Sequence, residues 1–381
     1  MKIVMFYHSL VSDWNHGNAH FLRGVARELL ARGHQVTVFE PRDGWSRTQL
    51  LTEQGPAALA AFQRRFPDLR SVFYDGLPDL DEILDGADLV LVHEWNEPQL
   101  VAALGAHRER SRSYRLLFHD THHRSVSAPH EMERYDLSRY DGVLAFGGLI
   151  RDIYIDRGWA QKVWVWHEAA DTSVFTPQDN PGTARGDVVW VGNWGDGERT
   201  EQLHEYLLGP IGALKATATL HGVRYPPEAL AALRACGARY GGWIANYDVP
   251  ALFARHRATV HVPRQFYTTH LPGIPTIRPF EALACGIPLV CAPWEDSEGL
   301  FRPGTDYLVA KNGRQVRELL RDVLIDETHA AQLAENGLET LRARHTCAHR
   351  VDELLEVCRE LGLGAAAPPK RAAGRRVEAV P

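Results

Sequence analysis

Residues 272–290 carry the clearest chemical signal in the sequence: Pro-Gly-Ile-Pro-Thr-Ile-Arg-Pro-Phe-Glu-Ala-Leu-Ala-Cys-Gly-Ile-Pro-Leu-Val. A Gly/Pro loop runs there into a short helix, and Gly-Ile-Pro then leads into a buried strand. Arg278 and the N-terminus of that helix can neutralise an anion. Glu281 lies one turn further on, where its carboxylate can accept two hydrogen bonds from a ribose diol. The apolar neighbours of Glu281 favour a specific partner over a solvent-exposed position.

A second glycine-rich loop, residues 191–199, follows a predicted strand in the middle of the chain. Three glycines and Arg199 at the start of a helix can cradle a phosphate. The Gly-Lys-Ser/Thr of a Walker A loop is missing, which disfavours ATP hydrolysis. A flexible glycine turn explains this loop equally well when it is considered alone.

Two loops of the first half carry weaker signals. Residues 14–20 connect a strand to a helix, and Gly17 lets backbone N–H groups approach an anion there, although a polar turn explains them equally well. Residues 118–124 place three histidines, an aspartate and an arginine after a strand. The four-residue spacing of His119 and His123 shares one face only on a helix, so a polar active-site loop is favoured over a metal site. A surface loop that is rich in histidine by chance is the alternative.

Strands alternating with helices must position these loops. Continuous apolar strands separated by helices predict parallel sheets that are covered on both faces. A turn-rich linker at residues 175–186 separates two such series, so we expect two doubly wound α/β domains with a ligand site in the cleft between them. The predicted strands are residues 3–7, 36–39, 88–92, 114–118, 142–146, 163–166, 187–191, 216–220, 258–262, 288–291 and 307–309.

Composition narrows the class of protein. The chain has 381 residues, 45% of them hydrophobic and 24% charged, with a net charge of −6, which argues against non-specific nucleic-acid binding. Five cysteines without a CxxC pair disfavour a disulfide framework and a structural zinc site. Met1 leads directly into a strand-like run and no apolar stretch is long enough to span a bilayer, so we expect a cytoplasmic protein with at most peripheral membrane contact.

Residues 279–290 resemble the glutamate-containing donor motif of GT-B glycosyltransferases of the family-four kind and their spore-maturation-like relatives. The likeness extends over roughly residues 1–361, through stretches that agree in the same order: residues 18–20, 30–36, 118–120, 167–177 and 242–253. It implies two Rossmann-like domains facing across a cleft. Residues 1–174 form the acceptor-side domain, 187–345 the nucleotide-sugar domain, 346–362 a helix crossing back to the first domain, and 363–381 a disordered tail.

The resemblance also implies roles for individual residues. Glu281 would bind the ribose hydroxyls, Arg199 and Arg278 the donor diphosphate, and His119 would orient the transferred sugar. Gly17 and Asn18 would approach the phosphates from the N-terminal side. The other residues expected at the donor site are Gly192, Asn193, Ile244, Gly273, Ile274, Thr276 and Ile277.

The expected reaction moves a sugar from a nucleoside diphosphate-sugar to an acceptor hydroxyl with retention of configuration. It uses no metal and no cofactor, because helix ends and arginines carry the diphosphate charge. The acceptor is expected to be a sugar, a lipid-linked sugar, a polysaccharide or a natural product, and not a nucleic acid. Base, sugar and acceptor stay open, and the tryptophans Trp45 and Trp95 could stack on a sugar or pack.

Two departures from the family pattern keep other functions open. Gly273 stands where a second glutamate is usual, and Asn193 stands where an arginine is usual. A nucleotide-sugar epimerase of GT-B fold and a catalytically inactive nucleotide-sugar-binding protein are therefore the alternatives.

Overall fold

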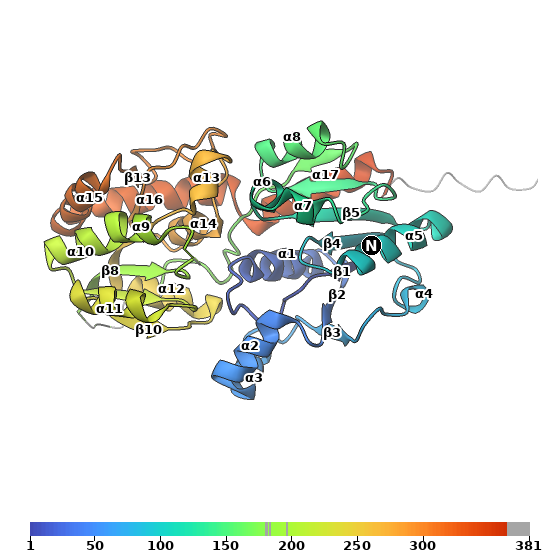
Figure 1. Cartoon of the computed structure of the whole chain (residues 1–381), viewed down its shortest axis with the longest axis horizontal. Helices are drawn as coiled ribbons and strands as arrows, with labels where there is room; N and C mark the ends of the chain where they lie inside the picture. Colours follow the sequence, from blue (N-terminus) through green and yellow to red (C-terminus); the bar gives the residue numbers. More distant parts are fainter. Residues whose placement is uncertain (180–181, 183, 196, 364–381) are drawn as a thin grey trace, which may run out of the picture.

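Two parallel β-sheets, one in each half of the chain, form the framework of the computed structural model (Figure 1). The structure describes residues 1–179, 182, 184–195 and 197–363, so the predicted tail from residue 364 onward and parts of the predicted linker lie outside it. In spatial order the first sheet has seven strands: β3 (Ser71–Tyr74), β2 (Gln35–Pro41), β1 (Lys2–Phe6), β4 (Leu89–His93), β5 (Arg115–Asp120), β6 (Gly142–Ala145) and β7 (Val163–Val165). The second has six: β10 (Arg239–Gly242), β9 (Ala218–His221), β8 (Gly186–Val191), β11 (His256–His261), β12 (Leu289–Cys291) and β13 (Leu308–Val309).

The strand order in each sheet reverses next to the first strand of that domain. β1 pairs with β2 on one side and β4 on the other, and β8 pairs with β9 and β11 in the same way. Connections leave such a reversal point toward opposite faces of the sheet, which opens a crevice beyond the carboxyl ends of the strands. The two sheets present these ends to each other, so the sequence-based prediction of two doubly wound domains is confirmed.

Helices cover the sheets. The first domain contains α1 (Ala19–Ala31), α2 (Trp45–Gln54), α3 (Pro56–Arg65), α4 (Leu80–Ile83), α5 (Pro98–Ser111), α6 (Arg124–Ser127), α7 (Pro129–Met132) and α8 (Gly148–Asp156). The second contains α9 (Thr200–Leu203), a π-helical turn η1 (His204–Leu208), α10 (Gly209–Leu214), α11 (Pro227–Ala235), η2 (Asn246–Asp248), α12 (Val249–Ala254), α13 (Gln265–Thr269), α14 (Ile277–Ala284), α15 (Gly313–Ile325) and α16 (Glu327–Arg344).

The last helix, α17 (Cys347–Glu360), returns to the first domain and packs against α1 (Figure 1). Its apolar face joins the core that α1 forms with the first sheet, and Trp166 Nε1 donates to the Arg350 carbonyl at 2.8 Å. A capping box at Thr346 and His349 fixes the start of the helix. The prediction of a C-terminal helix that crosses back to the first domain is therefore confirmed.

In the parts of the chain that the structure describes, none of the helices has the length and apolar character needed to cross a bilayer.

Candidate active site

A cavity of about 440 Å³ lies between the carboxyl ends of the two sheets. The loops that follow the strands of the first sheet contribute His8, residues 15–18, Trp95, His122 and Glu168. The second sheet contributes residues 191–193 at the end of β8 and His261, Val262 and Arg264 at the end of β11, and the start of α14 closes the cavity with residues 276–278. This is the crevice in which doubly wound sheets bind their ligands.

Arginines give the second-domain wall a strong positive charge. Arg199, Arg264 and Arg278 all line the cavity. Arg199 donates to the carbonyls of Val262 and Asn193, and Arg264 Nη1 pairs with Glu198 at 2.7 Å. Burial, and next the charge of Arg264, lower the pKa of Arg199 to about 9. A bound anion would relieve this repulsion, so the wall is suited to a diphosphate.

Two helix N-termini open on the same cavity. Gly17 and Asn18 precede α1, and Thr276 precedes α14. A β-carbon on Gly17 would come within 3.0 Å of Ile277 Cγ2, so a glycine favours this close approach of the two helix starts. The unpaired N–H groups and dipoles of both helices add to the arginine charge.

Glu281 lies behind this wall, fully buried and outside the residues that line the cavity. Its Oε1 accepts from His20 Nδ1 at 3.2 Å and from Asn246 Nδ2 at 3.4 Å, and its Oε2 pairs with Arg278. Burial acts to raise the pKa of Glu281, but Arg278 and His20 outweigh it, so the net pKa lies below the ordinary value. The ionised carboxylate holds Arg278 at the cavity edge; its predicted contact with a ribose stays a prediction.

A side pocket of about 40 Å³ continues from the cavity between the domains. Trp243, Ile244 and Val223 line it together with Asn193 and Arg278. Asn193 spans the junction, because its amide donates to the Asn15 side chain of the first domain and accepts from the Val223 backbone N–H at 3.0 Å. This contact gives a structural reason for an asparagine where the family usually has arginine.

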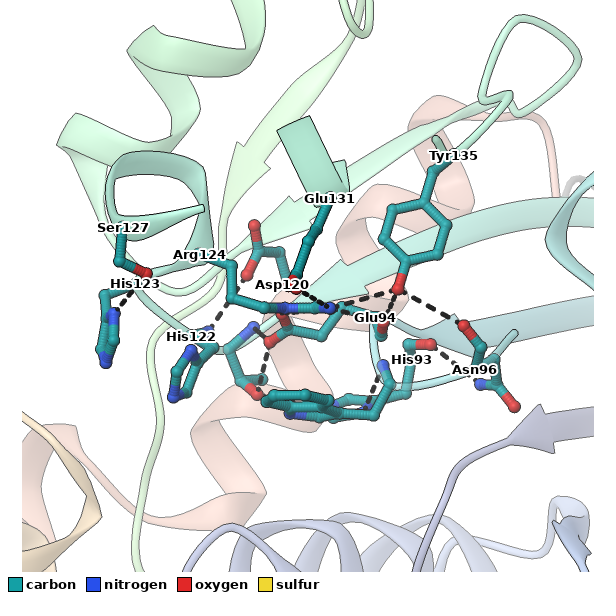
Figure 2. Close-up of polar contacts among 12 residues, drawn as sticks. His93, Glu94, Asn96, Asp120, His122, His123, Arg124, Ser127, Glu131 and Tyr135 are labelled. Atoms are coloured by element: carbon teal, nitrogen blue, oxygen red, sulfur yellow. Dashed lines mark hydrogen bonds and ion pairs between the residues drawn. The ribbon is translucent and has the colours of Figure 1, made fainter. Parts of the chain in front are cut away.

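The first-domain wall is built on a buried ion pair (Figure 2). Arg124 donates to Glu94 Oε2 from Nε at 3.1 Å and from Nη2 at 3.0 Å, and its guanidinium lies 4.2 Å from the centre of the Trp95 ring. Glu94 Oε1 accepts from the Thr121 backbone N–H at 2.8 Å. The pair therefore fixes both Trp95 and the loop that carries His122, and both residues line the cavity.

Histidines on this wall are held neutral. Burial, and next the charge of Arg124, lower the pKa of His8 to about 3, and burial lowers the pKa of His122 well below its ordinary value. Both side chains line the cavity, and each has a buried Nδ1 without a hydrogen-bond partner. The wall can thus offer uncharged hydrogen-bonding groups to a ligand.

The structure separates the predicted site residues into two groups. Gly17, Asn18, Gly192, Asn193, Arg199, Thr276, Ile277 and Arg278 line the cavity, and Ile244 lines the side pocket. Among the described residues, His119, Gly273, Ile274 and Glu281 line neither. His119 is buried within β5, an interior strand of the first sheet, where its Nδ1 contacts the Tyr7 hydroxyl at 2.7 Å.

Gly273 and Ile274 lie at a separate contact between the domains. Gly273 has a φ of 87°, and a β-carbon there would come within 2.3 Å of Ser297 Oγ. Ile274 packs against Gly147. Glu298 completes the contact by accepting from the Gly148 N–H at 2.8 Å and pairing with His167 at 2.6 Å. This segment joins the domains and leaves no room for a larger side chain at Gly273.

Sequence reasoning missed His8, His122, Glu168 and Arg264 as individual wall residues. Each follows the carboxyl end of a strand, at β1, β5, β7 and β11 respectively, and that position was the available signal. In the described ranges, no cluster of three or more His, Cys, Asp or Glu side chains is placed to hold a metal ion.

Comparison with known proteins agrees with this geometry. The family described as "Glycosyltransferase Family 4" matches residues 16–174, and "Glycosyl transferase-like" matches residues 199–356. Sucrose-phosphate synthase from Thermosynechococcus elongatus is 14% identical with a TM-score of 0.65, covering 95% of this chain and 99% of its own. HepE from Anabaena, solved with UDP and glucose, is 17% identical with a TM-score of 0.67, covering 94% of this chain and 99% of its own.

A further similar structure is an alpha-glucosyltransferase in complex with UDP-glucose and DNA, 13% identical with a TM-score of 0.69, covering 94% of this chain and 99% of its own. A search among curated proteins finds no match. The fold is that of the GT-B enzymes. Taken together, the two family matches and the fold identify the chain as a GT-B group 1 glycosyltransferase.

Proposed function

We propose that the protein transfers a sugar from a nucleoside diphosphate-sugar to a carbohydrate hydroxyl with retention of configuration and without a metal ion. Binding of the nucleoside diphosphate-sugar is supported by the cavity wall on which Arg199, Arg264 and Arg278 meet the N-termini of α1 and α14. UDP is the first nucleotide to test, because several of the similar structures contain UDP or UDP-glucose. Retention follows from the family resemblance and is read from the anomeric proton of the product.

In this reaction the bond between the sugar anomeric carbon and the diphosphate oxygen breaks, and a bond to the acceptor oxygen forms. The acceptor proton passes to the departing diphosphate. The arginines and helix ends neutralise the charge that grows on that diphosphate, which lowers the barrier to its departure.

The carbohydrate acceptor is proposed to bind at the opposite, first-domain wall of the cavity. Trp45 is 42% exposed and Trp95 is 37% exposed, and both line the cavity beside the neutral His8 and His122. Aromatic faces beside uncharged imidazoles fit a neutral hydroxylated ring better than a polyanion. That the acceptor is not a nucleic acid and that the enzyme works in the cytoplasm stay predictions, tested by acceptor competition with DNA and by cell fractionation.

Calorimetric titration tests the donor site. We expect one nucleoside diphosphate out of UDP, GDP, dTDP, ADP and CDP to bind preferentially, with an affinity unchanged by EDTA. Arg264→Ala should weaken it about tenfold or more, since a hydrogen bond to a charged group contributes about 1.5–3 kcal/mol. Arg314→Ala is the matched control, because that arginine is 76% exposed on α15. Absence of binding by all five diphosphates from folded protein would refute the proposed function.

A further inference from the structure

Glu168 presents an incompletely bonded carboxyl group to the cavity. The residue is only 2% exposed, it lines the cavity, and its Oε2 has no hydrogen-bond partner. The Asn18 side chain hydrogen-bonds this carboxyl. A buried polar atom without a partner is destabilising, so a ligand that supplies the missing hydrogen bond gains affinity.

The backbone around Glu168 is held firmly, so its side chain enters the cavity from a fixed point. The carbonyl of Glu168 accepts from Arg350 Nε of the crossing helix at 3.4 Å. Two residues further on, the Ala170 N–H donates to the His345 carbonyl at 3.0 Å, and the Ala170 carbonyl accepts from the Cys347 N–H at 2.9 Å. A side chain on such a support loses little conformational freedom when it contacts a ligand.

Charged groups of both domains act on Glu168. The charges of Glu281 and Glu94, one from each domain, raise the pKa of its carboxyl, and the charge of Arg278 from the second domain lowers it. Arg278 belongs to the wall that suits the diphosphate, and Glu94 supports the aromatic wall. The sugar of the donor must lie between these two walls, because its anomeric carbon joins the diphosphate before transfer and the acceptor after it. Glu168 lines the cavity that these two walls enclose.

We propose that Glu168 hydrogen-bonds a hydroxyl of the transferred sugar and so selects which sugar the enzyme moves. The proposal rests on the proposed function. Burial, and next the charge of Glu281, raise the pKa of Glu168 well above its ordinary value, which keeps the carboxyl protonated. A protonated carboxyl both donates and accepts, which matches the hydrogen-bonding capacity of a single sugar hydroxyl.

Comparing a nucleotide with its nucleotide-sugar isolates this contact. We expect Glu168→Ala to leave the Kd for UDP within about threefold of wild type and to raise the Kd for the preferred UDP-sugar about tenfold or more. Glu168→Asp withdraws the carboxyl by one methylene while keeping its chemistry, and should give the same divergence if the alanine variant does not fold. Glu40→Gln serves as the control, since Glu40 is a buried carboxyl that lines neither cavity nor side pocket.

Sugar selectivity supplies the second readout. Wild type should favour one of two UDP-sugars that differ at a single hydroxyl, and the Glu168 variants should reduce that preference about tenfold. Equal changes in the Kd for UDP and for UDP-sugar, or an unchanged preference, would overturn the role of Glu168. If the wild-type protein bound no nucleoside diphosphate at all, the proposed function itself would fail, and this outcome is distinct from the other two.

Discussion

The contact of Glu281 with Arg278 makes a double-mutant cycle informative. Glu281 is fully buried and its Oε2 pairs with Arg278, which in turn lines the cavity. We predict that Glu281 supports nucleotide binding by holding the Arg278 guanidinium in place. The cycle comprises wild type, Glu281→Gln, Arg278→Ala and the double variant, each titrated with UDP in a calorimeter.

The magnitudes follow from the contacts. Arg278→Ala removes a charged hydrogen bond to the diphosphate, worth about 1.5–3 kcal/mol or roughly 10–150-fold in Kd. Glu281→Gln keeps the shape of the side chain and releases Arg278, and should cost about 1–2 kcal/mol of binding free energy. In the double variant this second cost should vanish, because Arg278 is no longer there to be misplaced. The coupling energy should therefore equal the effect of Glu281→Gln alone.

Additive effects, within about 0.5 kcal/mol, would refute this reasoning. Direct binding of the ribose by Glu281, as the family resemblance implies, predicts such additivity. It also predicts that the penalty of Glu281→Gln shrinks when 2′-deoxy-UDP replaces UDP. Thermal melts of all four proteins provide the control for folding.

Three further predictions concern stability. Gly273→Glu should lower the thermal midpoint without raising transferase activity, because φ is 87° at this position and a β-carbon would lie 2.3 Å from Ser297 Oγ. The expected loss of unfolding free energy is about 1–3 kcal/mol, and an unchanged thermal midpoint would contradict this prediction. Asn193→Ala should lower the free energy of unfolding by about 1–3 kcal/mol, measured by urea titration, because the Val223 N–H loses its acceptor. A variant that loses nucleotide affinity but keeps its stability would count against this prediction. The free energy of unfolding should fall on acidification below about pH 6.5. Several buried histidines gain a proton there in the unfolded state, but in the folded state their pKa is only about 3. Each such histidine contributes a loss of up to about 1.4 kcal/mol of unfolding free energy per pH unit. A flat thermal midpoint between pH 7 and 5 would exclude their burial as neutral groups. These histidines are His8, His119, His123, His261 and His345.

Periodicity and turn chemistry were enough to predict most of the framework. The continuous apolar runs of β1, β4 and β5 identify buried parallel strands, and α1 ends where Gly33 stops its helical pattern. The two strands that were missed, β3 and β10, lie at sheet edges, where partial exposure removes the apolar signal. Edge strands are short and depend on their neighbour, so sequence alone specifies them poorly.

The site was predicted less completely than the fold, because residue type does not reveal which way a side chain turns at the end of a strand. His119 and His122 stand three positions apart, one within β5 and the other just after it, yet only His122 lines the cavity. Motif resemblance located the α14 region correctly, but it could not show that Glu281 is enclosed by His20, Asn246 and Arg278. His20 and Asn246 both stand more than 30 positions from Glu281 in the sequence, and only the tertiary fold brings them to it.

The crossing helix has a mechanical consequence for the enzyme. The chain leaves the first domain after Asp171 and re-enters it at Thr346, and these two passages lie side by side, joined by a bridge between Ala170 and Thr346. Domains joined by a single connection can rotate about it in many directions. Two adjacent connections restrict the relative motion of the domains to a hinge about one axis. Opening for product release and closing on a new donor would then retrace a single path, with Glu168 two residues from the axis.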